Sequence, residues 1–281
     1  MKDFQSVGKI VDGNEGSKCN YPMRLDTYGC GCQHDCKYCY AKSLLDFRGL
    51  WNPKSPSVAP ISRIAAEIKK VPRGTVVRLG GMTDYFQPCE KLYKNTYKTI
   101  KLLNKYRVEY LIVTKSDMVA DYLDILDKDL AHVQITVTTL DDDLSKTYEK
   151  APVPSKRIEA IRRLQEAGVD VAMRLRPFIP PYIDFNKLNN LGIKKVIIEF
   201  LRANSWVEKW FDIDYTEYTV KQNGYRHLPL EKKINYIRQI TGFEEMSVCE
   251  DESTAYKYWQ ACFNHNKNDC CNLRRRHGPE N

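Results

Sequence analysis

Short apolar runs alternate along the chain with longer stretches in which apolar residues recur at helical spacing. The runs are rich in Val and Ile and end at Gly or polar residues, a pattern typical of buried strands. In one of the longer stretches Ile61, Ile64 and Ile68 share a helix face. The pattern predicts strands at 21–27, 76–82, 109–115, 132–140, 169–179 and 193–201, with helices near 60–73, 91–106, 118–129 and 155–168.

This order of elements predicts a parallel sheet. Strand and helix alternate about six times with short connections, and such units are right-handed βαβ crossovers. A closed eightfold barrel usually takes about 250 residues, so we expect a partial (β/α)6 barrel over residues 20–205. From about 206 the pattern loosens into an aromatic-rich stretch, one helix near 230–241 and a Cys-rich tail. Residues 206–281 therefore read as a separate small C-terminal module.

Composition narrows the class of protein. The 281 residues are 42% hydrophobic and include ten cysteines, too few for a small disulfide-rich scaffold and more than packing needs. No apolar run approaches the roughly 18 residues of a membrane span, and the first residues show no signal-peptide pattern. We therefore expect a cytoplasmic protein with no membrane partner, in which clustered cysteines bind metal or act in redox chemistry. The net charge of +8 permits an anionic partner without requiring one.

Three cysteines directly follow the first predicted strand. Cys32, Cys36 and Cys39 stand in GCQHDCKYCYA with C-x3-C-x2-C spacing. Three thiolates on one loop can hold three corners of a [4Fe–4S] cluster and leave the fourth iron open to substrate or cofactor. The alternative is a closed site with Cys30 as fourth ligand, although alternate residues of an extended strand point to opposite sides.

This spacing, with Tyr38 before the last cysteine, resembles the signature of radical S-adenosylmethionine enzymes. The resemblance implies that the amino and carboxylate groups of S-adenosylmethionine chelate the open iron, and that one electron from the cluster cleaves the sulfonium. A 5′-deoxyadenosyl radical then abstracts hydrogen from the substrate, while the protein contributes position and exclusion of water. The resemblance also implies that Tyr38 and Tyr40 hold the adenine, and that a flavodoxin or ferredoxin type of protein supplies the electron.

Polar residues at the predicted strand ends are the other candidates for cofactor binding, because barrel ligands sit at the carboxyl ends of strands. In the second strand's loop, paired glycines allow close backbone approach, and Thr83 and Asp84 offer acceptors for the methionyl ammonium or, alternatively, cap a helix. The guanidinium fork of Arg174 or Arg176 suits the cofactor carboxylate, unless these residues only form ordinary ion pairs. The complete set is Gly80, Gly81, Thr83, Asp84, Thr138, Arg174, Arg176 and Glu199.

Residues from about 24 to 200 resemble the branch of this superfamily that contains spore photoproduct lyase. The resemblance rests on TDYFQPCEKLYKNTY, EYLIVTKS and the stretch from QITVTTLDDD to RPFIPP. In the lyase, which reverses a thymine dimer in DNA, a cysteine just before the Ser/Thr-Asp pair returns hydrogen to the product. Gly81 occupies that position here, which puts dimer reversal in doubt. Cys89 is the candidate catalytic thiol in its place, or else an inert buried one.

A second set of cysteines lies in the tail. Cys249, Cys262, Cys270 and Cys271 fall within 23 residues, and in a radical enzyme they suggest a second [4Fe–4S] cluster. Structural zinc and no metal are the alternatives. Because consecutive side chains diverge in extended backbone, we expect one of Cys270 and Cys271 to be a bystander.

The expected substrate is DNA or a nucleotide. Arg274–Arg276, scattered lysines and the aromatic residues between 206 and 225 combine charge with stacking surfaces, as nucleic-acid binding does. Alternatively, the basic run is a solvated tail and the aromatics pack the open side of the barrel. Two competing functions stay open: radical modification of a peptide, amino acid or small metabolite, and a non-catalytic zinc-stabilised nucleic-acid-binding module.

Overall fold

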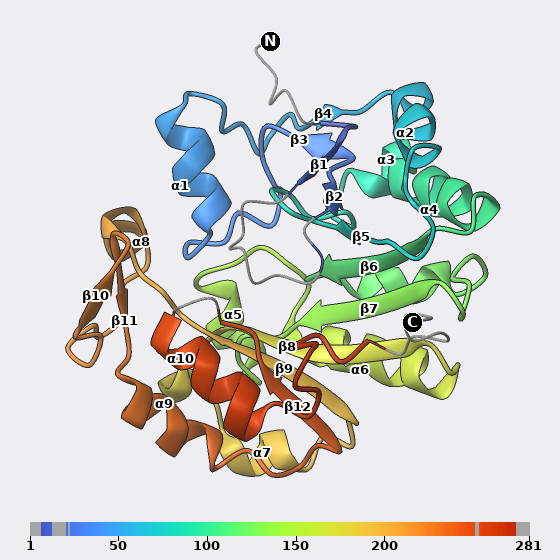
Figure 1. Cartoon of the computed structure of the whole chain (residues 1–281). Coiled ribbons are helices and arrows are strands. Elements are labelled where there is room, and N and C mark those ends of the chain that lie inside the picture. Colours follow the sequence, from blue (N-terminus) through green and yellow to red (C-terminus); the bar gives the residue numbers. More distant parts are fainter. Residues whose placement is uncertain (1–6, 13–20, 22, 251–252, 274–281) are drawn as a thin grey trace.

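An eight-stranded sheet forms the centre of the computed structural model, which describes residues 7–12, 21, 23–250 and 253–273 (Figure 1). Its strand order is β1-β2-β5-β6-β7-β8-β9-β12. Every neighbouring pair from β2 to β12 is parallel, and only β1 runs antiparallel to β2. The strands are β1 (Ile10–Asp12), β2 (Met23–Leu25), β5 (Val76–Leu79), β6 (Glu109–Thr114), β7 (Ala131–Thr136), β8 (Asp170–Phe178), β9 (Lys195–Phe200) and β12 (Glu245–Val248).

Helices follow the strands as the alternation predicts. The crossover helices are α2 (Ile61–Ile68), α3 (Glu90–Tyr93), α4 (Asn95–Lys105), α6 (Pro154–Glu166) and α7 (Phe185–Asn189). Shorter elements lie around the carboxyl ends of the strands: β3 (Tyr28–Gly29), α1 (Tyr40–Phe47), β4 (Ser57–Val58), α5 (Asp142–Lys146), α8 (Ser205–Trp210) and the hairpin β10 (Val220–Gln222) and β11 (Tyr225–His227). The predicted partial α/β barrel is confirmed. In the part of the chain that the structure describes, no helix is long and apolar enough to cross a bilayer.

One predicted helix is much shorter than expected. The segment 118–129 contains only a 3-10 helix, η1 (Asp117–Tyr122), followed by turns. The Ser116 side chain accepts the Met118 N–H at the start of η1, and Asp127 accepts the Asp129 N–H two residues on. Such local bonds compete with helical ones, so the acidic residues favour turns here.

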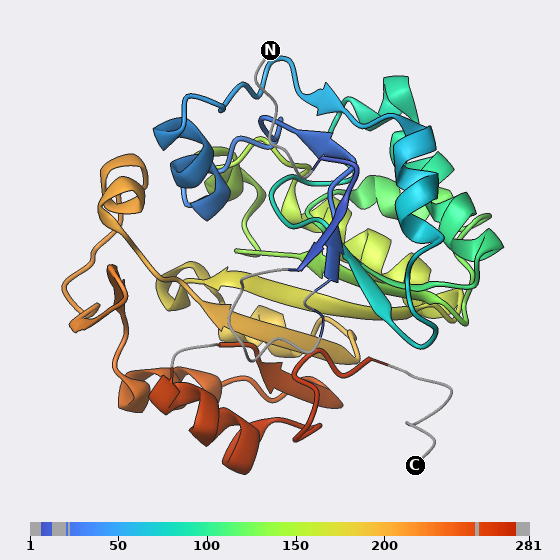
Figure 2. The same ribbon diagram turned by 45° about the horizontal axis from the view of Figure 1, so that its top comes forward.

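The C-terminal segment is not separate from the barrel. Its helices α9 (Leu230–Ile237) and α10 (Ser253–Tyr258) flank β12, which pairs in parallel with β9 and adds a seventh parallel strand to the six predicted (Figure 2). Met246, Ser247 and Val248 stand opposite Val196, Ile197 and Ile198 in this register. The predicted separation therefore fails for β12, because its apolar positions complete the sheet edge beside β9.

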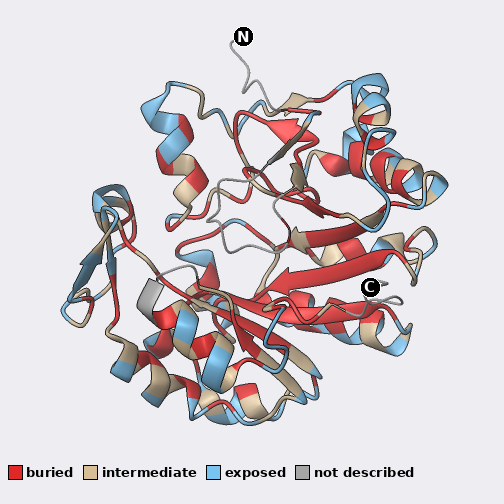
Figure 3. Cartoon of the chain, viewed as in Figure 1, coloured by how far each residue is buried: buried red, intermediate tan, exposed pale blue. Residues whose placement is uncertain are grey.

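The sheet is covered on both faces, as a parallel sheet requires. Every residue of β5 and β7 is buried, and the strands form the buried centre of the molecule (Figure 3). The main apolar cluster runs along the sheet and under the crossover helices. A smaller cluster unites Val76, Leu111, Ala172 and Ile197 with Cys271 of the tail.

A row of charges crosses five neighbouring strands near their amino ends. His132 Nδ1 lies 2.7 Å from Asp170 and its Nε2 lies 3.5 Å from Glu109. Lys195 Nζ lies 2.8 Å from Asp170 and 3.4 Å from Glu245. Burial lowers the pKa of His132, but the carboxylates of Asp170 and Glu109 outweigh burial and raise it above the ordinary value. The folded state therefore favours the protonated imidazole.

We expect the stabilisation by His132 to depend on pH. Because its folded-state pKa is raised, the contribution is fully present below about 6.5, the unfolded value, and is lost as the pH rises through the folded pKa. His132→Gln should lower the free energy of unfolding by about 1.5–3 kcal/mol near pH 6, the size of a charged hydrogen bond, and by less near pH 9. Urea unfolding at both pH values measures this. Exposed His265 provides the control: His265→Gln should change little at either pH, and a penalty for His132→Gln that is independent of pH would refute the assignment.

Candidate functional site

The loop that carries the first three cysteines joins β3 to α1 and has a constrained backbone. Gly31 has a φ of 146°, and a Cβ there would lie 2.6 Å from the backbone of Asn52 and Pro53, so only glycine fits. Cys30 has a left-handed φ of 59°, not extended backbone. It is buried and, unlike the other three cysteines of this segment, does not line the cavity described below.

Two parts of the chain hold this loop from either side. The Gln33 N–H donates to Gln87 Oε1 at 2.9 Å, and Gln33 Oε1 in turn accepts the Cys89 N–H at 2.6 Å. On the other side the Lys37 N–H donates to Tyr148 O at 2.9 Å, and the Lys150 N–H donates to His34 O at 2.7 Å. Four hydrogen bonds to two other parts of the chain therefore hold the path of the loop.

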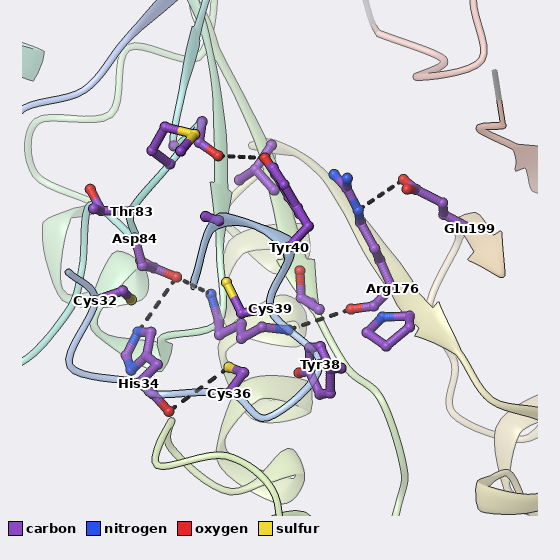
Figure 4. Close-up of a pocket in the computed structure, with 18 of the residues that line it drawn as sticks. Cys32, His34, Cys36, Tyr38, Cys39, Tyr40, Thr83, Asp84, Arg176 and Glu199 are labelled. Atoms are coloured by element: carbon purple, nitrogen blue, oxygen red, sulfur yellow. Dashed lines mark hydrogen bonds and ion pairs between the residues drawn. The ribbon is translucent and has the colours of Figure 1, made fainter. Parts of the chain in front are cut away.

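The three thiols of Cys32, Cys36 and Cys39 line one cavity of about 930 Å³, a volume that includes solvent at its mouth (Figure 4). Figure 4 shows the cysteine loop on one side and the Arg176–Glu199 pair across from it. The strand ends and the loop also contribute His34, Tyr38, Tyr40, Arg78, Gly80, Gly81, Thr83, Asp84, Thr114, Lys115, Thr136 and Arg202 to the lining. Eleven residues expected from the sequence thus meet here: Cys32, Cys36, Tyr38, Cys39, Tyr40, Gly80, Gly81, Thr83, Asp84, Arg176 and Glu199.

The electrostatics of the thiols suit a metal cluster. All three are free thiols, and burial raises their pKa values. A thiolate in this place needs a compensating cation, and bound iron supplies one. His34, which also lines the cavity, is buried, and its ring nitrogens make no hydrogen bond among the described residues beyond the ion-pair contact with Asp84. The donors present therefore fit a [4Fe–4S] cluster with three protein ligands.

The arrangement differs from a site for one ion. Among residues 7–12, 21, 23–250 and 253–273, no three His, Cys, Asp or Glu side chains are placed to hold a single metal ion. A cubane cluster spreads its thiolates over separate irons, so its ligands need not converge on one point. Three cysteines on one loop match the number of protein ligands that such a cluster with one open iron uses.

Asp26, at the end of the first strand, shapes the glycine loop after β5. Its Oδ1 accepts the N–H groups of Gly81, Met82 and Thr83 at 3.1, 3.0 and 3.4 Å. Gly80 has a φ of 93°, and a Cβ there would lie 2.7 Å from Val113 O. Asp26 was not among the site residues expected from the sequence, although a carboxylate directly after a predicted strand could have indicated it.

Asp84 lines the cavity, but its carboxylate already has donors from the protein. It accepts the Phe86 N–H at 2.8 Å, the Thr114 hydroxyl at 2.7 Å and the Lys115 N–H at 2.7 Å. Burial would raise the pKa of Asp84, but His34 and these hydrogen bonds outweigh it and lower the pKa. Asp84 therefore joins β5 to β6 and caps no helix, and its contact with the methionyl ammonium stays a prediction.

The Thr83 side chain is likewise hydrogen-bonded within the protein, because its hydroxyl donates to Tyr28 O at 2.9 Å. Tyr40 lies on the other side of the glycine loop and donates to Gly81 O at 2.6 Å. The Arg176 guanidinium lies 5.6 Å from the Tyr40 ring centre, and its Nε lies 2.9 Å from Glu199. Tyr40, Arg176 and Glu199 thus form one connected wall of the cavity.

A buried charge network beneath the loop was missed from the sequence. Glu149 forms an ion pair with Arg157 and accepts the Tyr38 hydroxyl. Lys115 Nζ lies 3.8 Å from Glu149 and 5.0 Å from the Tyr38 ring centre. Burial raises the pKa of Glu149, but Lys115 and Arg157 outweigh it, so the pKa is lowered and the carboxylate stays charged. The network ties Tyr38, and with it Cys36, to the end of β6 and to α6.

Seven residues expected at a site do not line this cavity. Thr138 is buried, and its hydroxyl lies 2.9 Å from Tyr148 Oη. Arg174 lies behind Glu199, bonded to it at 2.9 Å and to Gln134 at 2.6 Å. Cys89 precedes α3, where burial and Glu90 raise its thiol pKa to about 12. The other four are the tail cysteines Cys249, Cys262, Cys270 and Cys271.

Fold and site together define an α/β-barrel protein that carries a three-cysteine loop at the carboxyl ends of its parallel strands. The model of the radical SAM superfamily matches residues 27–186 of the chain. The chain belongs to the radical S-adenosylmethionine superfamily.

The chain is also similar to other proteins and to solved structures. An uncharacterized protein of Methanocaldococcus jannaschii is 32% identical over 198 residues, which cover 66% of this chain and 74% of that protein. An uncharacterized protein of Acidianus two-tailed virus is 26% identical and covers 74% and 75%. The solved structure of spore photoproduct lyase complexed with dinucleoside spore photoproduct shares the fold, with a TM-score of 0.63 over 85% of this chain and 79% of that one, at 18% identity.

Proposed function

We propose that this radical S-adenosylmethionine enzyme abstracts hydrogen from a nucleic acid or nucleotide. The observation that carries the proposal is the single cavity in which the cysteine loop meets the ends of the parallel strands, bordered by aromatic and basic side chains. When bound, the cluster and S-adenosylmethionine supply a 5′-deoxyadenosyl radical. The chain itself supplies ligands, orientation and shielding from water.

Several side chains are placed to bind the cofactor. Cys32, Cys36 and Cys39 would hold the cluster. Lys115 and Arg176 bring positive charge to the cavity beside that loop, and Lys115 Nζ also donates to Arg176 O at 3.4 Å. Such cations suit the methionyl carboxylate of S-adenosylmethionine. Tyr38 and Tyr40 border the same cavity and offer ring faces to the adenine.

Aromatic and basic groups lie on α1, α8 and β11, next to the cavity-lining residues Tyr40 and Arg202 in the sequence or in space. Trp206 of α8 is 37% exposed, and its ring centre lies 5.5 Å from that of Trp210. Lys42 of α1 lies 4.9 Å from the Trp210 ring. Arg202, which lines the cavity, lies 5.5 Å from the ring of Tyr225 in β11. We call this set of five residues the aromatic platform. Stacking surfaces combined with cations are what single-stranded nucleic acids bind.

The reaction proposed differs from reversal of a thymine dimer. The lyase of similar fold was solved with a dinucleoside spore photoproduct, which supports a nucleotide-containing substrate. The resemblance in sequence, however, implies that Gly81 stands where the lyase has its hydrogen-returning cysteine. A Cβ at Gly81 would lie 2.6 Å from Arg24 Cδ and 3.2 Å from Asp26 Oδ2, so a thiol there requires Arg24 to move. We therefore favour modification of a base or sugar over dimer repair.

Binding of a fluorescent single-stranded oligonucleotide tests the substrate class. Trp206→Ala/Trp210→Ala should weaken binding about tenfold or more, since each base stacked on an aromatic ring contributes about 1–3 kcal/mol. Leu92→Ala serves as the control, because Leu92 is 77% exposed on α3 and is not part of the platform. Affinity should fall as salt increases. A flat salt dependence, or equal affinities of the double variant and the control, would point instead to a peptide or small metabolite. Arg274–Arg276 lie outside the described residues.

A further inference from the structure

Three of the four tail cysteines meet, although they come from separate segments. Cys249 follows β12, whereas Cys270 and Cys271 lie in a turn closed by a bond from the Asn272 N–H to Asp269 O at 3.1 Å. Buried Cys271 belongs to a small apolar cluster on the sheet, and Cys249 and Cys270 both pack against that cluster. Both adjacent cysteines therefore lie at the same cluster as Cys249, which speaks against one of them being a bystander. Turn backbone is not extended, so consecutive side chains can reach a common point.

The turn that carries two of these thiols is bound to both ends of the parallel sheet. Tyr21, just before β2, donates to Asp269 Oδ2 at 2.5 Å. Asn272 donates to Ser247 Oγ of β12 at 2.8 Å and accepts from Lys195 Nζ of β9 at 3.1 Å. Buried Cys271 also belongs to the small apolar cluster with β5, β6, β8 and β9. The thiols thus occupy a fixed place between the first and last parallel strands.

This thiol group lies close to the radical cavity. The Arg174 guanidinium is 3.8 Å from Cys249 Sγ and 2.9 Å from Glu199 Oε2. Glu199 lines the cavity and pairs with Arg176 there. A single Arg–Glu pair therefore connects the Cys249 thiol to the cavity wall.

Cys262 does not belong to this group. It is exposed in the π-helical turn Trp259–Phe263, and none of the thiol contacts above involves it. The fourth tail cysteine expected as a ligand is therefore replaced by the close pair Cys270 and Cys271. Cys19 lies outside the described residues.

We infer that Cys249, Cys270 and Cys271 hold a second iron–sulfur cluster, separate from the one on the cysteine loop. Soft thiolates select iron–sulfur, zinc or copper(I). Because the chemistry of the superfamily to which the chain belongs already requires an iron–sulfur cluster, we favour iron–sulfur over zinc or copper(I). This site stands on its own contacts and does not depend on the nature of the substrate.

Iron and sulfide analysis of the full chain tests the site. In a Cys32→Ala/Cys36→Ala/Cys39→Ala background, anaerobic reconstitution with ferrous iron and sulfide should leave about four irons and four sulfides per chain. Adding Cys249→Ser/Cys270→Ser should remove them, whereas adding Cys262→Ser should not. Near-ultraviolet circular dichroism of each variant shows whether the fold survives.

A second measurement needs no substitution in the tail. After reconstitution, alkylation followed by mass spectrometry should find Cys249, Cys270 and Cys271 protected and Cys262 labelled. Absence of iron from the triple-alanine background, zinc as the only metal bound, or equal labelling of all four tail cysteines would each overturn the inference. None of these outcomes touches the proposed function, which is tested by oligonucleotide binding and by 5′-deoxyadenosine formation.

Discussion

The Cys32→Ala/Cys36→Ala/Cys39→Ala variant is expected to form no 5′-deoxyadenosine from S-adenosylmethionine in the presence of a strong one-electron reductant. The three thiols line one cavity, and burial raises their pKa values. The thiolates are therefore stable there only when a bound metal cluster compensates their negative charge. Without these ligands the cluster has no place beside the cofactor. Chromatography of anaerobic reaction mixtures measures the product, and the loss should be complete within detection.

Cys89→Ala is the matched control for this result. Cys89 packs against the same loop through its bond to Gln33, but it does not line the cavity, and its raised thiol pKa makes it inert near neutral pH. This variant should keep 5′-deoxyadenosine formation. Persistence of the product in the triple variant would defeat the assignment of the cluster to the loop.

The second large effect is expected on stability. Arg157→Ala should lower the free energy of unfolding by about 3–5 kcal/mol, because it removes one partner of a buried ion pair. Arg157 and Glu149 are both fully buried. In the variant Lys115, whose Nζ lies 3.8 Å from Glu149, remains as the nearby cation. Tyr38 bonds to the same carboxylate, so the variant should also bind less iron. Urea unfolding and iron analysis measure the two effects.

Two further variants separate charge loss from other effects. Arg163→Ala lies on the same helix, and its exposed pair with Asp121 should contribute only about 0–1 kcal/mol. Glu149→Gln/Arg157→Met removes both charges and should cost less than Arg157→Ala alone, because no buried charge is left unpaired. If Arg157→Ala and Arg163→Ala destabilised the protein equally, the network would not have the role assigned to it.

The fold could be predicted because its elements have distinct local periods. The runs beginning at Val76, Glu109 and Lys195 are strands in the structure, and the Ile61–Ile68 face is a helix. Two features of the fold could not be predicted from the periodicity. Local hydrogen bonds shorten the helix near residue 118, and β12 is a four-residue strand that only its pairing with β9 reveals.

Some residues of the candidate site could likewise be predicted from the sequence, and others could not. The cysteine loop, Tyr40, the glycine loop and Arg176 could be predicted from spacing and from strand ends. Asp26, Lys115 and Glu149 could not, because their roles depend on partners far along the chain. Glu149, for instance, pairs with Lys115 of one crossover and accepts the Tyr38 hydroxyl of another. Nothing in the residues next to it in the sequence indicates that it is buried.

The sequence by itself determined the family and the primary cluster site, because C-x3-C-x2-C after a first strand is a local pattern that one loop can satisfy. Only the tertiary structure decided which of the tail cysteines lie together. Cys249, Cys270 and Cys271 meet because β12 completes the sheet and a turn bound to Tyr21 and Ser247 brings two adjacent thiols to a third. Contacts between distant segments follow from how the sheet closes, and spacing in the sequence does not encode them.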